Sequence, residues 1–192
     1  MADATRMTPR LLTKALALCL LLTLACPAVA HAETGTERAG TYLMYLMPAF
    51  ALGYSTAMGD YEGDLQMIES TGTTGLTTLL LKSTVHADRP AGAEGAEGES
   101  FPSGHTAIAF SSAAYLQMRY GYALGLPAYA AASFVGYSRI QGGEHHWVDV
   151  LAGAGLGIGF SYLFTEPYHT EDFDLSAYAS PVEVGLVLTV RF

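Results

Sequence analysis

The stretch Ser138–Asp149 has the sequence SRIQGGEHHWVD and combines an arginine, two adjacent histidines and an aspartate. His145 and Asp149 are four residues apart, so on a helix their side chains would share one face. Asp149 could then accept a hydrogen bond from one ring nitrogen of His145 and leave the other as a nucleophile or base. The double glycine at 142–143 predicts a turn that brings Arg139 toward the imidazole. Taken alone, this stretch is more typical of a surface pair at a helix start.

A second stretch predicts a binding site for an anion. Phe101–His105 has the sequence FPSGH and directly precedes the apolar run Thr106–Leu116. Proline and serine are typical of helix starts. The unpaired amides at such a start, including those of Ser103 and Gly104, would attract a phosphate or another anion.

A third stretch supplies two cations. Lys82 closes an apolar helix, and Arg89 follows in the next loop with six residues between them. With Arg139 and the histidines His105 and His145, the chain offers what phosphate chemistry needs. Cations and fixed dipoles hold the oxygens, one histidine attacks, and the other protonates the leaving group.

These three stretches resemble the signature motifs of the type 2 phosphatidic acid phosphatase superfamily. That superfamily also includes bacterial class A acid phosphatases and vanadium haloperoxidases. The motifs are K-x6-R-P (Lys82–Pro90), P-S-G-H (Pro102–His105) and S-R-x5-H-x3-D (Ser138–Asp149), all complete and in the family's order. Three motifs in order are far more specific than any one of them, and the resemblance extends over the helices around them.

The resemblance implies a phosphatase that works through a phosphohistidine intermediate. His145 would attack phosphorus while Asp149 holds it, and His105 would protonate the leaving oxygen and then activate water. The phosphoryl oxygens would be held by Lys82, Arg89, Arg139 and the amides of Ser103 and Gly104. No metal and no other cofactor is expected.

The composition favours a lipid phosphate as the substrate, because 51% of the residues are hydrophobic and only 14% are charged. Phosphatidic acid, phosphatidylglycerol phosphate, an isoprenyl diphosphate and lipid A all stay open, as does a small phosphate ester. The alternatives are a vanadate-dependent haloperoxidase, although such enzymes are usually much longer, and a non-catalytic outer-membrane-associated protein. Nucleic acid is excluded as a partner by the formal net charge of −9.

Two further features of the charged residues bear on possible binding sites. Asp60, Glu62 and Asp64 form an acidic turn that could bind a metal, but three acids in a turn are more often solvated. From Glu33 onward the chain has six Lys and Arg against 17 Asp and Glu. Since three of the six lie in the motifs, a basic cluster here is more typical of an anion site than of a basic surface.

Residues 1–32 have the pattern of an export signal, with three basic residues, an apolar core and an Ala-His-Ala cleavage site. The alternative is an uncleaved first membrane helix over residues 11–30. We expect a helical phosphatase domain over residues 33–167, exported to the bacterial cell envelope, in the periplasm or in a membrane with its site facing the periplasm.

The expected fold is all-α, a bundle of five to six helices with a short C-terminal β-hairpin. Apolar runs predict helices at 41–57, 65–86, 106–118, 125–137 and 147–164, and a sixth at 11–30 if that segment is retained. The Gly- and Glu-rich segment 87–100 is interpreted as a loop that could serve as a lid. The tail, 168–192, alternates with period two and predicts strands. Its hairpin could cap the domain or form an edge for a homo-oligomer.

Overall fold

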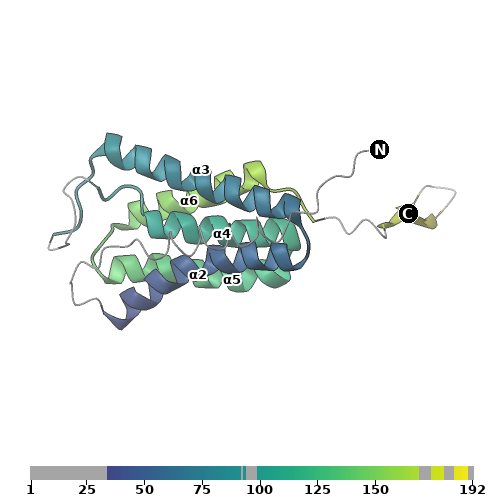
Figure 1. Ribbon diagram of the computed structural model, residues 1–192, viewed down its shortest axis with the longest axis horizontal. Coiled ribbons are helices and arrows are strands. Elements are labelled where there is room, and N and C mark those ends of the chain that lie inside the picture. The colour runs from purple at the N-terminus through teal and green to yellow at the C-terminus, as the bar shows by residue number, and fades with distance from the viewer. Residues whose placement is uncertain (1–33, 92, 94–98, 169–173, 180–183, 190–192) are drawn as a thin grey trace, which may run out of the picture.

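Five helices, packed side by side, make up most of the described chain in the computed structural model (Figure 1), which describes residues 34–91, 93, 99–168, 174–179 and 184–189. They are α2 (Gly35–Ala57), α3 (Tyr61–Val85), α4 (Gly104–Tyr120), α5 (Tyr122–Gln141) and α6 (Trp147–Phe164). The predicted helical bundle is confirmed. The predicted export signal over residues 1–32 lies outside the described residues.

Four helices begin earlier than the apolar pattern predicts, and in α2 and α3 a capping side chain marks the earlier start. α2 begins after Thr34, which forms a capping box with Glu37. α3 begins after Asp60, whose carboxylate accepts the Gly63 N–H at 2.9 Å. Acidic side chains in the first turn of each helix also stabilise it by interacting with the positive end of the helix dipole.

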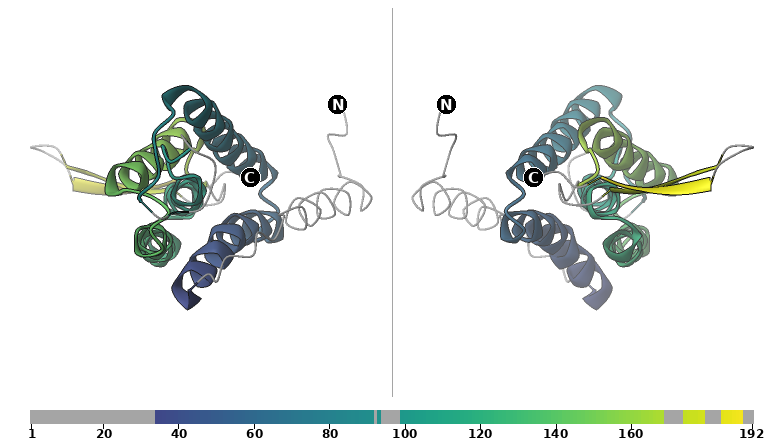
Figure 2. Two further views of the ribbon diagram at one scale, coloured as in Figure 1. Left: turned by 90° about the vertical axis from the view of Figure 1, so that its left-hand side faces the viewer. Right: turned by 90° about the vertical axis from the view of Figure 1, so that its right-hand side faces the viewer.

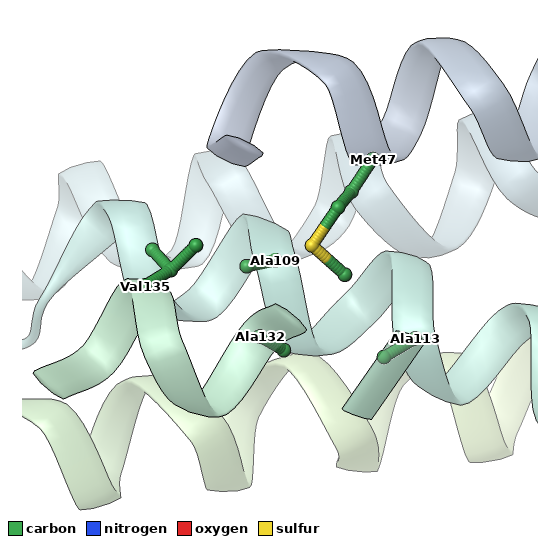
Figure 3. Packing of buried hydrophobic residues seen from close by; sticks show 5 residues of the cluster. All are labelled: Met47, Ala109, Ala113, Ala132 and Val135. Carbon is green, nitrogen blue, oxygen red and sulfur yellow. The ribbon is translucent and has the colours of Figure 1, made fainter. Parts of the chain in front are cut away.

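α4 is the central helix of the bundle. It packs against α2, α3, α5 and α6, and the end-on views show it among the other four (Figure 2). Figure 3 shows one part of this core, where Met47 of α2 meets alanines of α4 and α5. The cluster contains Met47, Ala109, Ala113, Ala132 and Val135. Such small side chains let the helix backbones approach closely.

α4 packs closely against α6 at two glycines. A Cβ atom at Gly153 would lie 2.5 Å from the carbonyl oxygen of Ser103, and one at Gly157 would lie 2.3 Å from that of Ala107. Only glycine fits at such distances. The start of α4 is therefore held against the first half of α6.

Large apolar side chains cover the outside of the four outer helices, whereas many buried positions carry small polar ones. Exposed examples are Leu46 and Phe50 on α2, Leu76, Leu79 and Leu80 on α3, Leu126 and Phe134 on α5, and Leu151, Tyr162 and Leu163 on α6. Fully buried polar examples are Ser55, Ser70, Thr74, Ser111, Ser112 and Ser161. This distribution is the reverse of that expected for a bundle surrounded by water. Among the described helices, α6 alone is both long and apolar enough to cross a membrane.

A buried ion pair closes the end of the bundle at the C-terminus of α4. The guanidinium of Arg119 donates to both carboxylate oxygens of Asp60, at 2.8 and 2.6 Å, and to the carbonyl of Glu166 at 2.9 Å. Tyr120 also donates to Asp60, at 2.7 Å. Asp60, one of the three acids of the turn considered as a metal site, is thus already paired with Arg119.

Two short strands follow the helices. β1 (Asp174–Ala179) pairs antiparallel with β2 (Val184–Thr189), with Asp174 opposite Thr189. A role for this segment as a cap or as a self-association edge stays a prediction, as do the boundaries at residues 33 and 167.

Candidate active site

All three sequence motifs lie at one end of the bundle, opposite the Arg119–Asp60 pair. The C-terminal ends of α3 and α5 meet the N-terminal ends of α2, α4 and α6 there, at the left-hand side of Figure 1. Residues up to 102 positions apart in the chain form hydrogen bonds at this end. The up-and-down order of the helices thus converts three separate motifs into one site.

His145 lies in the loop before α6, and Asp149 lies in the first turn of that helix. Nδ1 of His145 is 3.7 Å from Oδ2 of Asp149, which is an ion-pair distance and too long for a hydrogen bond. The expectation of a direct bond between two residues on one helix is therefore wrong, because the helix begins two residues after His145. Oδ2 instead accepts hydrogen bonds from the Ser100 hydroxyl at 2.6 Å and from the His146 backbone N–H at 2.8 Å.

The environment of His145 favours a neutral imidazole. Only 5% of the residue is exposed, and its Nδ1 has no hydrogen-bond partner among the described residues. Burial lowers the pKa of His145 to about 4, with the charges of Lys82 and Arg89 acting in the same direction and that of Asp149 opposing them. At neutral pH the ring carries an unprotonated nitrogen, which a nucleophile requires.

The start of α4 lies directly beside that of α6. Ser103, its N-cap, donates its backbone N–H to the carbonyl of Asp149 at 2.9 Å. The expectation that this amide binds an anion is therefore wrong, since it already has an acceptor. Ala107 is the first residue to donate back along the helix, to the Ser103 carbonyl at 3.0 Å. The amides of Gly104, His105 and the residue after it have no acceptor within the helix, so the amides suited to an anion begin one residue later than expected.

Two of the predicted cations come from α3 and the loop after it. The ammonium of Lys82 donates to the carbonyl of Glu99. Nη1 of Arg89 lies 2.5 Å from Oε2 of Glu144 and 3.3 Å from the Glu144 carbonyl oxygen. The side chain of Arg89 therefore contacts both the side chain and the backbone of Glu144, the residue directly before His145.

The third predicted cation, Arg139, is 5% exposed and fixed from two sides. Its Nε donates to the hydroxyl of Ser138 at 3.2 Å, and its Nη2 donates to the backbone carbonyl of Glu37 at 2.6 Å. The charges of Arg139, Lys82 and Arg89 all act on His105. The structure thus places Lys82 and Arg89 near both histidines and Arg139 near His105.

Three residues of this site are missing from the sequence-based set. Ser100 holds Asp149, Glu144 holds Arg89, and Glu37 holds Arg139. Only Glu144 carries a sequence signal, as an acid beside the expected nucleophile. Within the described part of the chain, no group of three His, Cys, Asp or Glu side chains is placed to hold a metal ion.

Comparison with known proteins identifies the family. The model of the PAP2 superfamily matches residues 64–171, which include all three motifs. The chain belongs to the PAP2 superfamily. The resemblance drawn from the motifs is thereby confirmed, and with it the class of enzyme, a phosphoric ester hydrolase of PAP2 type.

The PAP2 chain is similar in sequence to the lipid A 4'-phosphatase of Helicobacter pylori. The two are 36% identical over 143 residues, which span 69% of this chain and 70% of the relative.

Two solved PAP2 structures share its fold. The crystal structure of Aquifex aeolicus LpxE matches with a TM-score of 0.57 and 25% identity, over 77% of this chain and 92% of that one. A transmembrane PAP2 type phosphatidylglycerolphosphate phosphatase from Bacillus subtilis matches with a TM-score of 0.55 and 26% identity, over 82% and 85% of the two chains.

Proposed function

We propose that this PAP2 enzyme hydrolyses a phosphate monoester or diphosphate of a lipid through a phosphohistidine at His145. The observation that carries the proposal is the placement of a buried, neutral imidazole between a carboxylate and a set of cations. A neutral nucleophile next to fixed positive charges suits attack on an anionic phosphoryl group.

In the first step, the lone pair of His145 Nε2 attacks phosphorus. Asp149 faces the other ring nitrogen, Nδ1, at 3.7 Å, and stabilises the positive charge that develops on the ring. The bond between phosphorus and the leaving oxygen breaks, and protonated His105 gives that oxygen its proton. Lys82, Arg89 and Arg139 balance the charge on the three remaining phosphoryl oxygens.

In the second step, neutral His105 takes a proton from water, and the water oxygen attacks phosphorus. The phosphorus–nitrogen bond breaks, inorganic phosphate leaves, and His145 returns to its starting state. Burial lowers the pKa of His105 most, and the nearby cations lower it further; a phosphoryl anion in the site offsets the part that is due to the cations. Bound substrate therefore raises the pKa of His105 toward the protonated form that the first step needs.

The outer surface of the bundle supports a lipid substrate and a membrane location. Leucines, phenylalanines and tyrosines project from four helices, and α6 has the length and hydropathy of a membrane span. Relatives of this chain are named for lipid phosphates. A lipid substrate could then keep its acyl chains in the bilayer while its phosphate reaches the site. Export of the chain, with residues 1–32 as the signal, belongs to the same proposal and can be checked by sequencing the N-terminus of the mature protein.

A phosphate-release panel tests the function. The full chain is purified in detergent and given lipid A, phosphatidic acid, phosphatidylglycerol phosphate, an isoprenyl diphosphate and p-nitrophenyl phosphate. We expect at least one lipid to be turned over with a higher kcat/KM than p-nitrophenyl phosphate, and orthovanadate to inhibit. Turnover of the soluble ester alone would refute a lipid substrate, and a peroxide-dependent halogenation activity on adding vanadate would favour a haloperoxidase.

A further inference from the structure

We propose that the first turns of α2, residues 34–40, form part of the catalytic machinery as the element that positions Arg139. This segment lies outside residues 64–171, the part of the chain that the family model matches. The inference rests on the proposed function, in which Arg139 contacts the phosphoryl group. It adds a positioning element from a helix that contains none of the three motifs.

The contact itself is made by the α2 backbone. Nη2 of Arg139 donates to the carbonyl oxygen of Glu37 at 2.6 Å, in a fully protein-enclosed position. A guanidinium is planar and has five N–H donors in a fixed arrangement. Since Nε is also bonded, to Ser138 Oγ at 3.2 Å, two contacts at different nitrogens fix both the position and the plane of the group.

The segment that offers this carbonyl is itself held rigidly. The Thr34 backbone N–H donates to Oε2 of Glu37 at 2.6 Å, and the Glu37 N–H donates to Oγ1 of Thr34 at 3.3 Å. This reciprocal pair is a capping box, which satisfies two amides at the helix start. Glu37 is 5% exposed, whereas Thr34 is exposed, so the Glu37 half of the box is buried against the end of α5.

Two glycines allow this close packing. A Cβ atom at Gly40 would lie 1.9 Å from Oγ of Ser138 and 3.3 Å from Nη2 of Arg139. A Cβ atom at Gly142 would lie 2.0 Å from Oε1 of Glu37. The Ser138 hydroxyl is held in turn by the Val135 carbonyl at 2.7 Å. α2 and α5 thus approach each other on both sides of Arg139, and the arginine cannot shift without moving one of them.

This arrangement matters because a transition state demands accurate placement of its charge partners. A shift of about 1 Å in a positioned group can reduce the rate by about a hundredfold. The ground-state complex is less sensitive, since long-range attraction between the guanidinium and an anion survives a small shift. A disturbance of α2 should therefore lower kcat more than it raises KM.

The decisive comparison is Gly40→Ala against Gly53→Ala, two substitutions in the same helix. A Cβ atom at Gly53 would meet nothing within 4 Å. We expect Gly40→Ala to lower kcat/KM for p-nitrophenyl phosphate by roughly ten- to a hundredfold, mostly through kcat, and to weaken orthovanadate inhibition by a similar factor. Gly53→Ala should stay within about twofold of the wild type.

A rescue experiment separates this cause from general damage to the fold. Replacing Ser138 by glycine in the Gly40→Ala protein removes both atoms that the new methyl group would meet within 3 Å, Oγ at 1.9 Å and Cβ at 2.7 Å. The double variant should therefore be more active than Gly40→Ala alone, a non-additivity that requires the two residues to act on one another. Equal losses for Gly40→Ala and Gly53→Ala, or unchanged vanadate inhibition in Gly40→Ala, would overturn the inference.

A second pair of variants decides the matter if Gly40→Ala does not fold. Glu37→Ala removes the capping box and the contact with Gly142, whereas Arg38→Ala changes its exposed neighbour. We expect Glu37→Ala to weaken vanadate inhibition severalfold and Arg38→Ala to leave it unchanged, and identical behaviour would count against the inference. The wild type serves as the reference for the function itself: if it neither hydrolyses an ester nor binds vanadate, the proposed function fails, whichever variant is measured.

Discussion

Arg89 and Glu144 form an ion pair inside the candidate active site, with Nη1 of the arginine 2.5 Å from Oε2 of the glutamate. Both side chains are about one-fifth exposed. A cation assigned to the phosphoryl group is therefore already neutralised by an acid in the substrate-free enzyme. A phosphate that enters the site must share Arg89 with this carboxylate or displace it.

The first prediction is that Glu144→Gln binds anions more tightly. The amide keeps the shape of the side chain and removes the competing charge. We expect KM and the inhibition constant of inorganic phosphate to fall by up to about fivefold, the factor that ~1 kcal/mol of a partly exposed ion pair provides. Steady-state kinetics with phosphate as the inhibitor measure both constants. Glu69→Gln, at an exposed position on α3, is the control, and a rise in both constants for Glu144→Gln would show that the acid supports binding instead.

The second prediction concerns the nucleophile. His145→Ala should lose activity by a factor on the order of 10³ or more while the protein stays folded, because the phosphoenzyme cannot form. Rapid quenching with labelled substrate should trap an acid-labile phosphoprotein in the wild type and none in the variant. His146→Ala is the matched control, since the neighbouring ring is 54% exposed. If His146→Ala abolished trapping and His145→Ala did not, the two roles would be reversed.

The third prediction is that Arg139→Lys is severely impaired although it keeps the charge. Lysine cannot reproduce the planar contacts to Ser138 and Glu37 or hold two phosphoryl oxygens at once. Loss of a charged hydrogen bond, ~1.5–3 kcal/mol, corresponds to roughly ten- to a hundredfold in kcat. The measurement is kcat on one lipid phosphate.

The control for this arginine must be chosen with care. Arg119 lies outside every motif, which makes it the obvious control from the sequence, but it forms a buried pair with Asp60. Replacing it would disturb the fold. The exposed Arg38→Lys is suitable instead, and equal kcat in Arg139→Lys and Arg38→Lys would exclude Arg139 as a direct phosphate ligand.

The fourth prediction is an unusually low acid limit for activity. The pKa of His145 is lowered to about 4, and a nucleophile with a lowered pKa stays unprotonated at every pH above that value. After correction for substrate ionisation, kcat/KM should fall only as the pH drops through about 4, not near the 6.5 of an ordinary histidine. Because Asp149 raises this pKa, Asp149→Asn should move the limit to lower pH. A limit that stays near pH 6.5 in the wild type would contradict the assignment.

The sequence allows the motif residues and the helices that carry them to be predicted, because both depend on local patterns. Apolar periodicity locates each helix, and the internal spacing of each motif places Lys82, His105 and His145 near helix ends. The resemblance to the PAP2 superfamily then supplies the roles proposed for them.

The contacts among these residues could not be predicted in the same way. Arg89 meets Glu144 across 55 positions, and Ser100 meets Asp149 across 49. Such pairs depend on how Arg89 and Ser100, which lie between α3 and α4, are placed beside the start of α6, which no local pattern encodes. The expected hydrogen bond between His145 and Asp149 is absent for a related reason. The spacing argument assumed that both residues lie on one helix, whereas the helix begins only at Trp147.

The contact between α4 and α6 has a consequence for how this enzyme can change. Ser103 is joined to α6 by a main-chain hydrogen bond to Asp149 and by the approach of its carbonyl to Gly153. The separation of His105, the proposed acid on α4, from His145, the proposed nucleophile before α6, is therefore set by backbone atoms and by the lack of a side chain at Gly153. Residues that face the substrate can be exchanged without altering that separation. Selectivity for one lipid or another can drift in such a scaffold while the reaction itself stays the same.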